Sequence, residues 1–366
     1  MGIAEVSLYL SGCVLNGKIP DKSRLEGVKF EELYGFAADH MISAILGYAL
    51  ESAGMSQEKF SQARARAARK SVVLENDCRM ISESLESSGI WHMPLKGSVM
   101  KNYYPAFGLR EMSDVDILFD SSRSDDVRGI MKGLGFESQT STSSHHDVYH
   151  KPPLSIAEMH RELFGSWQAP EICRYYDDVK RLMILDEGKN YTYHFSTEDF
   201  YIHITAHSYH HYITAGTGIR SLLDEYVYLK KFSDSMNWEY ISQESLKLGI
   251  KDFEEKLRSL SLKVIDGGGL SEKESAMLKY IVNSGVHGSG ENVAKNEMMN
   301  LYGGNRVRFM LASIFPPFKK LKYTAPLVYR HKYLYPFYLI GRLVSGVITR
   351  PGRVILRLRS IFSRSK

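Results

Sequence analysis

The chain has few cysteines, and the three present lie far apart in a sequence of 366 residues: Cys13, Cys78 and Cys173. An odd number of widely spaced cysteines argues against a disulfide framework and against a cysteine-based zinc site, and it is typical of a reducing compartment. The N-terminus has no basic segment before its short apolar stretch, so we expect no cleavable signal. Val6 stands where N-myristoylation would require Ser or Thr. These features predict a cytoplasmic protein.

A long apolar run is also missing. The strongly apolar stretch 333–348 has only sixteen residues and contains Pro336 and Arg342, whereas a bilayer-spanning helix needs about 20 apolar residues. Hydrophobic residues make up 43% of the chain and charged residues 24%, which excludes disordered and collagen-like classes. The length predicts two or three domains with enough chain to bury a core without disulfides.

Acidic side chains are absent from the last 66 residues. Nine Arg and five Lys give the segment from Leu301 onward a formal charge of +14. The first 300 residues hold the other 33 basic groups and all 42 acidic groups. An acidic body that carries a purely basic tail indicates an anionic partner for the tail.

The end of this tail has an amphipathic pattern. After Pro351, Arg353, Arg357 and Arg364 share one helical face, and the apolar residues on the adjacent face are Val354, Leu358, Ile361 and Phe362. Such a helix can lie in an anionic membrane interface, which would place the protein at the inner face of the membrane. Packing on the acidic body is an equal alternative, and nucleic acid is a third, less favoured partner.

Hydrophobic periodicity predicts four regions. These are a helical region over 1–89, an α/β core over 90–165 whose sheet could extend to about 196, a helical region over 197–300 and the basic tail over 301–366. The strand candidates are 115–119, 136–139, 148–150 and 155–159. The predicted helices after residue 120 are 124–134, 201–212, 219–232, 238–248 and 272–282. The fold class is therefore α+β, a small mixed sheet flanked by helical regions.

Two carboxylates alternate with apolar residues inside the predicted core. Asp114 and Asp116 lie on either side of Val115, so on a strand both would point to the same face. Paired carboxylates repel unless a cation lies between them, and Mg²⁺ characteristically binds one or two carboxylates together with substrate phosphates. A third carboxylate, Glu158, could act as a further ligand or as a base if its strand lies beside the first.

A turn that precedes these acids is suited to phosphate. Gly97 lets backbone N–H groups approach an anion, and Ser98 adds a hydroxyl at the start of a short helix. Lys96 and Arg110 are cations next to this turn, so we expect them to contact phosphate, with an ordinary surface charge as the alternative.

Gly97-Ser98 followed by Asp114-Val115-Asp116 resembles the Gly-Ser…Asp-x-Asp pattern of the polymerase-β-like nucleotidyltransferase superfamily. The segments Leu95-Lys96-Gly97, 113–118 (SDVDIL) and 157–163 (AEMHREL) resemble a bacterial family of uncharacterised nucleotidyltransferases. The similarity extends over roughly 90–235. The fifteen residues between Ser98 and Asp114 exceed the minimal superfamily spacing, which leaves room for an extra loop over 103–110.

This resemblance implies that Asp114 and Asp116 hold Mg²⁺ or Mn²⁺, that Glu158 is the third catalytic carboxylate, and that Gly97 and Ser98 hold the triphosphate. It predicts transfer of a nucleotidyl group from an NTP to an unidentified acceptor, with a link to surface polysaccharide or modification pathways. The alternative is a catalytically silent relative that acts as a binding module at a membrane surface.

Two further groups of side chains lie in the second helical region. Four histidines occur at helical spacing, His203, His207, His210 and His211, and they favour a helix that packs beside the site over a metal site. Arg220 and Asp224 are one helical turn apart, which predicts an i,i+4 ion pair, with contact to the nucleotide or acceptor as the alternative.

Overall fold

The computed structural model describes residues 1–139, 145–165 and 170–286, and in the remainder residues 288, 293, 294, 296, 298, 305–315, 321 and 325–349. The chain divides into two compact units. The first contains residues 1–210 and 218–286, and the second contains 211–217 and 287–366.

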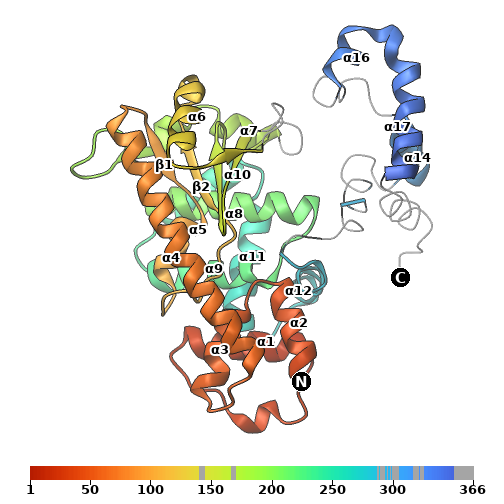
Figure 1. The fold of residues 1–366 in the computed structure, drawn as a ribbon. Helices are drawn as coiled ribbons and strands as arrows, with labels where there is room; N and C mark the ends of the chain where they lie inside the picture. The colour runs from red at the N-terminus through yellow and green to blue at the C-terminus, as the bar shows by residue number, and fades with distance from the viewer. Residues whose placement is uncertain are drawn as a thin grey trace. The chain divides into compact units, whose positions relative to one another are not determined.

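A mixed five-stranded sheet forms the centre of the first unit (Figure 1). Its strands are β1 (His92–Pro94), β2 (Val115–Phe119), β3 (Glu137–Ser138), β4 (His146–Lys151) and β5 (Ser155–His160), in the order β1-β2-β5-β4-β3. The pair β2–β5 is parallel and the other pairs are antiparallel. The predicted α+β class is confirmed. Asp114 precedes β2 and does not lie on it, and the candidate strand 136–139 is reduced to two residues.

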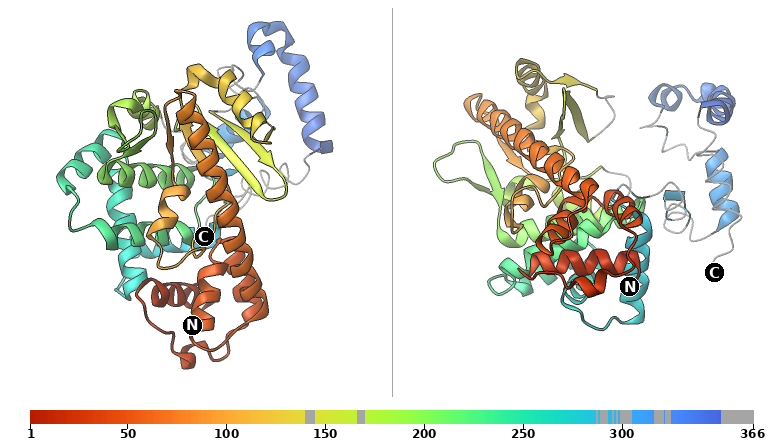
Figure 2. Two further views of the ribbon diagram at one scale, coloured as in Figure 1. Left: turned by 60° about the vertical axis from the view of Figure 1, so that its left-hand side comes forward. Right: turned by 60° about the horizontal axis from the view of Figure 1, so that its bottom comes forward.

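One face of the sheet is buried beneath α4 (Glu58–Ser87) and α6 (Ser124–Gly133). Figure 2 shows the long α4 running across the strands. Because successive side chains on a strand point to opposite faces, Val115, Ile117 and Phe119 enter this core together. Leu74, Ile81 and Leu85 of α4 pack against them. This apolar face sets the orientation of the alternate residues, which must point to the other side.

The remaining helices of the first unit surround this core. The N-terminal ones are α1 (Ile3–Leu15), α2 (Phe30–Asp39) and α3 (Ser43–Ser52), and the short α5 (Gly97–Met100) follows β1. The C-terminal ones are α7 (Pro170–Tyr176), α9 (Ile219–Phe232), α10 (Trp238–Lys247), α11 (Lys251–Asp266) and α12 (Glu272–Ser284), together with α8 (Thr197–Thr214), whose end belongs to the second unit. Ser271 caps α12, because its hydroxyl accepts the Glu274 N–H and its own N–H donates to the Glu274 carboxylate.

A small second sheet extends the first one at β1. It contains β6 (Met183–Leu185) and β7 (Tyr193–Phe195), which pair in antiparallel fashion. His92 forms a bridge with Thr192, and the His92 N–H donates to the Tyr191 carbonyl.

The described part of the second unit is helical. It contains α14 (Arg306–Ile314), α16 (Pro326–Arg330) and α17 (Tyr335–Thr349). The Arg342 guanidinium of α17 donates to the carbonyls of Ser313 and Ile314, at 3.0 and 3.5 Å. Within the part of the chain that the structure describes, no helix combines the length and the apolar character that a membrane span requires. The amphipathic segment predicted after Pro351 lies outside the described residues.

Candidate active site

Asp116 and Glu158 are neighbours across the parallel pair of strands. Asp116 on β2 is in register with Glu158 on β5, so their side chains leave the sheet on the same face, opposite the apolar core. Asp116 is buried and Glu158 is partly exposed. The structure therefore brings together two of the three predicted carboxylates, from segments that are far apart in the sequence.

Asp114 belongs to the same group of charges. Burial and the negative charges of Asp116 and Glu158 raise the pKa of Asp114 to about 7, and Lys96 and Arg220 only partly oppose this rise. A carboxyl whose pKa is raised by its acidic neighbours indicates an excess of negative charge, which a bound cation would relieve.

The raised pKa of Asp114 predicts a stability that falls with pH. The ordinary pKa of aspartate is 3.8 and the folded value is about 7, so between these values the folded chain holds more protons and loses stability as the pH rises. Without metal, we expect Asp114→Asn to unfold at a higher temperature than the wild type near pH ~8 and at a similar temperature near pH ~4. Calorimetry in EDTA measures this, and an equal difference at both pH values would contradict it.

Asp116 is held in its ionised form by two partners on one oxygen. The Lys96 Nζ lies 2.9 Å and the His160 Nε2 lies 2.8 Å from Asp116 Oδ1. Burial acts to raise the pKa of Asp116, but the Lys96 charge and the His160 hydrogen bond outweigh it and hold this pKa well below its usual range. Burial and the Asp116 charge raise the pKa of Glu158. The site therefore combines one strongly ionised acid with two more basic ones.

Lys96 and Gly97 form a tight turn beside β2. Lys96 has φ +42° and ψ −110°, a conformation that is costly for a residue with a Cβ and is found mostly where function demands it. A Cβ on Gly97 would lie 2.7 Å from Arg110 Nη1 and 2.9 Å from the Met112 sulfur. Any larger residue at position 97 would therefore displace the Arg110 or Met112 side chain. The turn also brings the Lys96 ammonium into contact with Asp116.

Ser98 lies on a different side of this turn. It lines the same pocket as Cys78 of α4, and its N–H donates to the Leu95 carbonyl at 3.1 Å. This pocket has a volume of about 260 Å³ and is also lined by α4 residues such as Ser71 and Glu75. The structure does not bring the Ser98 hydroxyl to the carboxylates.

Arg110 is part of a buried ion pair. Its Nε and Nη2 donate to the two oxygens of Asp224 on α9, both at 2.8 Å, and the Tyr104 hydroxyl donates to the same carboxylate at 2.8 Å. The i,i+4 pair predicted between Arg220 and Asp224 is wrong, because Asp224 turns toward Arg110. Arg110 lies beside Gly97 as expected, but its charge is balanced by Asp224.

Arg220 is a cation near the acids. Among the described residues, no carboxylate lies within salt-bridge distance of its guanidinium. Its Nη1 lies 3.2 Å from the Glu111 carbonyl oxygen and 3.1 Å from the Met41 sulfur. Burial and the nearby Arg110 lower its pKa, and its charge lowers the pKa of Asp114. Of the two arginines, Arg220 is the one whose charge remains available to an anion.

His203 supports the prediction that α8 packs beside the site. Its ring is fully buried and contacts the rings of Phe164, Tyr176 and Phe195. Burial and the positive charge of Lys96 lower its pKa to about 3. The groups of potential metal ligands found among the described residues do not include the α8 histidines.

His160 contacts Asp116 directly, a role that the sequence pattern did not predict. Asp116, Glu158 and His160 have ligand atoms within 4.8 Å of one another. Burial and Lys96 lower the pKa of His160, and its hydrogen bond to Asp116 opposes that effect. The signal was present, because His160 follows Glu158 by two residues and so shares its face of the strand.

An α+β protein whose sheet places Asp116 beside Glu158, next to a glycine turn that carries Lys96, is suited to binding a cation and a phosphate-bearing ligand. The comparison with protein families agrees with this class. The model of a family described as uncharacterised nucleotidyltransferases matches residues 26–264, so the chain belongs to that family. No curated protein and no solved structure matches the chain.

Proposed function

We propose that the protein transfers a nucleotidyl group from an NTP to an acceptor nucleophile with the help of Mg²⁺ or Mn²⁺ held by Asp114, Asp116 and Glu158. We further propose that it is a member of the polymerase-β-like superfamily. The observation that carries the proposal is the cross-strand placement of Asp116 and Glu158, with Asp114 close enough for its pKa to rise to about 7.

The donor set fits a hard divalent cation. Carboxylate oxygens are the ligands that Mg²⁺ and Mn²⁺ prefer. The two hydrogen bonds to Asp116 both fall on Oδ1, and among the described residues none falls on Oδ2. When bound, such a cation would neutralise charge on the phosphates and on the leaving pyrophosphate. This chemistry needs the three acids in their ionised form.

The other residues would bind the phosphates and move a proton. Lys96 Nζ contacts Asp116 at the site. A small movement of the Lys96 side chain would bring this ammonium from Asp116 to a phosphate oxygen. Glu158, with its raised pKa, is the better base to accept the proton of an acceptor hydroxyl, and Asp116 is the alternative. Gly97 and Ser98 remain the predicted residues for the triphosphate, and Arg220 adds an unpaired charge nearby.

The experiment that tests this function uses each of the four NTPs labelled at the α-phosphate. The full chain is incubated with one NTP and a cell extract, with Mg²⁺, Mn²⁺ or EDTA, and the label is followed into nucleic acid, protein, lipid or polysaccharide. We expect one fraction to be labelled only when metal is present. No labelled fraction with any NTP would contradict the proposal.

A catalytically silent binding module is the second candidate. Lys96 balances the charge of Asp116, and His160 contacts the same carboxylate oxygen, so the chain itself offers partners for this acid, as a silent relative would require. This alternative predicts that the affinity for NTP is the same with and without metal, and that no label passes from the NTP to any fraction of the extract.

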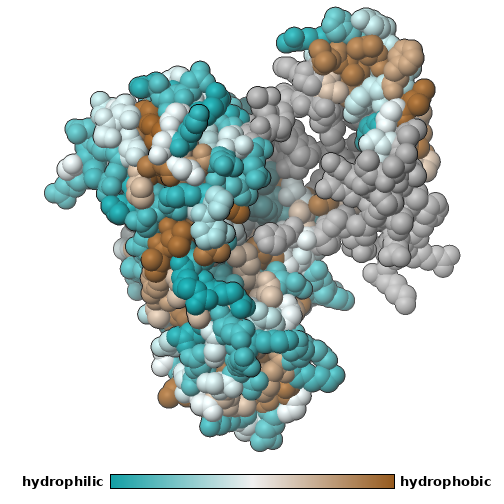
Figure 3. All heavy atoms as spheres, viewed as in Figure 1, coloured by the Kyte–Doolittle hydropathy of each residue, from teal (hydrophilic) through white to brown (hydrophobic). Residues whose placement is uncertain are grey.

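We propose that the second unit attaches the protein to an anionic membrane surface. Apolar side chains on α16 and α17 are highly exposed, among them Leu327 (68%), Phe337 (72%) and Ile340 (63%), and Figure 3 shows apolar surface on these helices. The segment from 301 onward carries fourteen basic and no acidic side chains. Exposed apolar groups combined with positive charge are what an interfacial segment needs. We also propose a link to surface polysaccharide or modification pathways, with which attachment to a membrane is consistent.

We expect the full chain to sediment with vesicles that contain anionic lipid, and truncation after Thr349 to weaken this binding because it removes five arginines and one lysine. Each basic group near the surface contributes about 1 kcal/mol, a contribution that salt screens. Vesicles of neutral lipid are the control. If the tail packs on its own chain instead, truncation will lower the melting temperature and vesicles will make no difference.

A further inference from the structure

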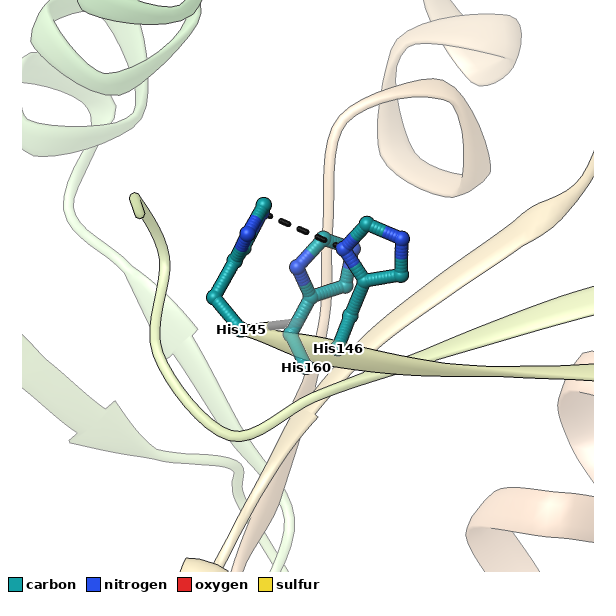
Figure 4. A group of neighbouring side chains, drawn as sticks. All are labelled: His145, His146 and His160. Atoms are coloured by element: carbon teal, nitrogen blue, oxygen red, sulfur yellow. Dashed lines mark hydrogen bonds between the residues drawn. The ribbon is translucent and has the colours of Figure 1, made fainter. Parts of the chain in front are cut away.

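Three histidines gather on the site face of the sheet, beside the acids. His146 begins β4, His145 precedes it, and His160 ends β5. In the antiparallel register of these strands His146 lies opposite His160. One ring nitrogen from each of the three residues lies within 4.8 Å of the other two. Figure 4 shows the three rings, and the closest pair is His145 and His146, whose ring centroids are 4.5 Å apart.

The spacing of two of these nitrogens suits a shared metal ion. His146 Nδ1 and His145 Nε2 are 3.2 Å apart. Two nitrogens bound to one tetrahedral zinc ion at about 2.0–2.1 Å would be roughly 3.4 Å apart. A small adjustment of two partly exposed rings is therefore enough to bring both into a coordination sphere.

One ring nitrogen of His160 lacks a partner. His160 is 1% exposed, and its Nδ1 is buried without a hydrogen-bond partner among the described residues. An unsatisfied buried nitrogen costs stability, so it calls for an explanation. A metal ion between the three rings would supply that partner.

Carboxylates lie behind two of the histidines. The other nitrogen of His160, Nε2, is 2.8 Å from Asp116 Oδ1, and His146 Nε2 is 3.8 Å from Glu158 Oε2. Metal-binding histidines almost always direct their second ring nitrogen to a carboxylate, a carbonyl or a water, which fixes the tautomer and strengthens the ligand. His160 already has this arrangement with Asp116. His146 would reach it after a small movement of its ring toward Glu158.

We propose that His145, His146 and His160 bind a borderline divalent cation such as Zn²⁺. Imidazole nitrogens select Zn²⁺, Co²⁺ or Ni²⁺, whereas the neighbouring carboxylates select Mg²⁺ or Mn²⁺. Three protein ligands leave a fourth position open, as in zinc sites that bind a water or a substrate group. His160 links the two sites, because it binds the cation through one nitrogen and holds Asp116 through the other.

The test uses Co²⁺ as a spectroscopic probe on the full chain, without any nucleotide. We expect one Co²⁺ per chain with the intense visible absorption of a tetrahedral site, and competition by equimolar Zn²⁺ but not by excess Mg²⁺. His145→Ala and His146→Ala should each weaken Co²⁺ binding by more than about 100-fold, since loss of an outer-shell partner alone costs roughly 10–100-fold. His150→Ala, on the same strand, is the matched control and should bind normally.

The variant Asp114→Asn distinguishes the three-histidine site from the proposed site of the carboxylates Asp114, Asp116 and Glu158. It should leave Co²⁺ binding unchanged, so the histidine site can be established even if nucleotidyl transfer fails. The proposal is overturned if the wild type shows no tetrahedral Co²⁺ spectrum, or if Asp114→Asn removes the spectrum while His145→Ala and His146→Ala keep it. Circular dichroism of each variant verifies the fold, and Zn²⁺ should raise the melting temperature of the wild type but not of His145→Ala.

Discussion

Metal-dependent NTP binding is expected to vanish when Asp114 and Asp116 are both replaced by asparagine. The two carboxylates supply most of the charge that attracts the cation, and asparagine keeps their shape but not their charge. In a titration with Mg²⁺ or Mn²⁺, the affinity of the double variant for NTP should equal that of the wild type in EDTA. An unchanged, metal-dependent affinity would remove both residues from the site.

The fold of this variant needs its own control, because Asp116→Asn leaves the Lys96 ammonium without its partner. Lys96 is only 15% exposed, so part of any loss could come from an uncompensated buried charge. The pair Asp125→Asn and Asp126→Asn is a matched control, since it removes two exposed acids from α6 of the same unit. Its NTP affinity should equal that of the wild type.

Turnover is expected to fall far more than nucleotide affinity in Glu158→Gln. A positioned base contributes about 10²–10⁴-fold to the rate, and a group that acts mainly in the transition state changes kcat with little effect on binding. The pKa of Glu158 is raised by burial and by Asp116, so the wild-type rate should increase with pH as this carboxyl ionises. The variant should lose that increase.

Measurement of kcat and of the NTP dissociation constant in the same preparation distinguishes the possible roles of Glu158. Equal losses in kcat and in NTP affinity would mean that Glu158 acts as a ligand already in the ground-state complex. No loss in either quantity would exclude Glu158 from the site. Glu162→Gln is the matched control, because Glu162 follows on the same segment with an exposed side chain.

Local patterns predicted those elements whose apolar residues have one clear period. The strand over 115–119 and the helix over 219–232 have the predicted bounds. The helix α1 was not predicted individually, because nearly every residue from Val6 to Leu15 is buried and no amphipathic face marks it. In α11 the charged first turns masked the apolar spacing of Leu257 and Leu260.

The site was only partly predictable for a different reason. Alternation along one strand placed Asp116 and Glu158 on suitable faces, but which strands are neighbours is a property of the whole sheet. The pairing of Arg110 with Asp224 joins residues 114 positions apart, and no local pattern contains that information. His145 and His146 were missed because β4 begins two residues earlier than its β-branched and aromatic residues indicate.

The parallel pairing of β2 with β5 also has a kinetic consequence. Asp116 and His160 are 44 positions apart, so the chain between them must close into a loop before the charges at β2 meet those on β5. Contacts of such long range form slowly, and they contribute little until much of the chain is in place. The repulsion between Glu158 and the acids at β2 therefore arises late in folding, and Glu158→Gln, which relieves it, should slow unfolding while leaving the folding rate nearly unchanged.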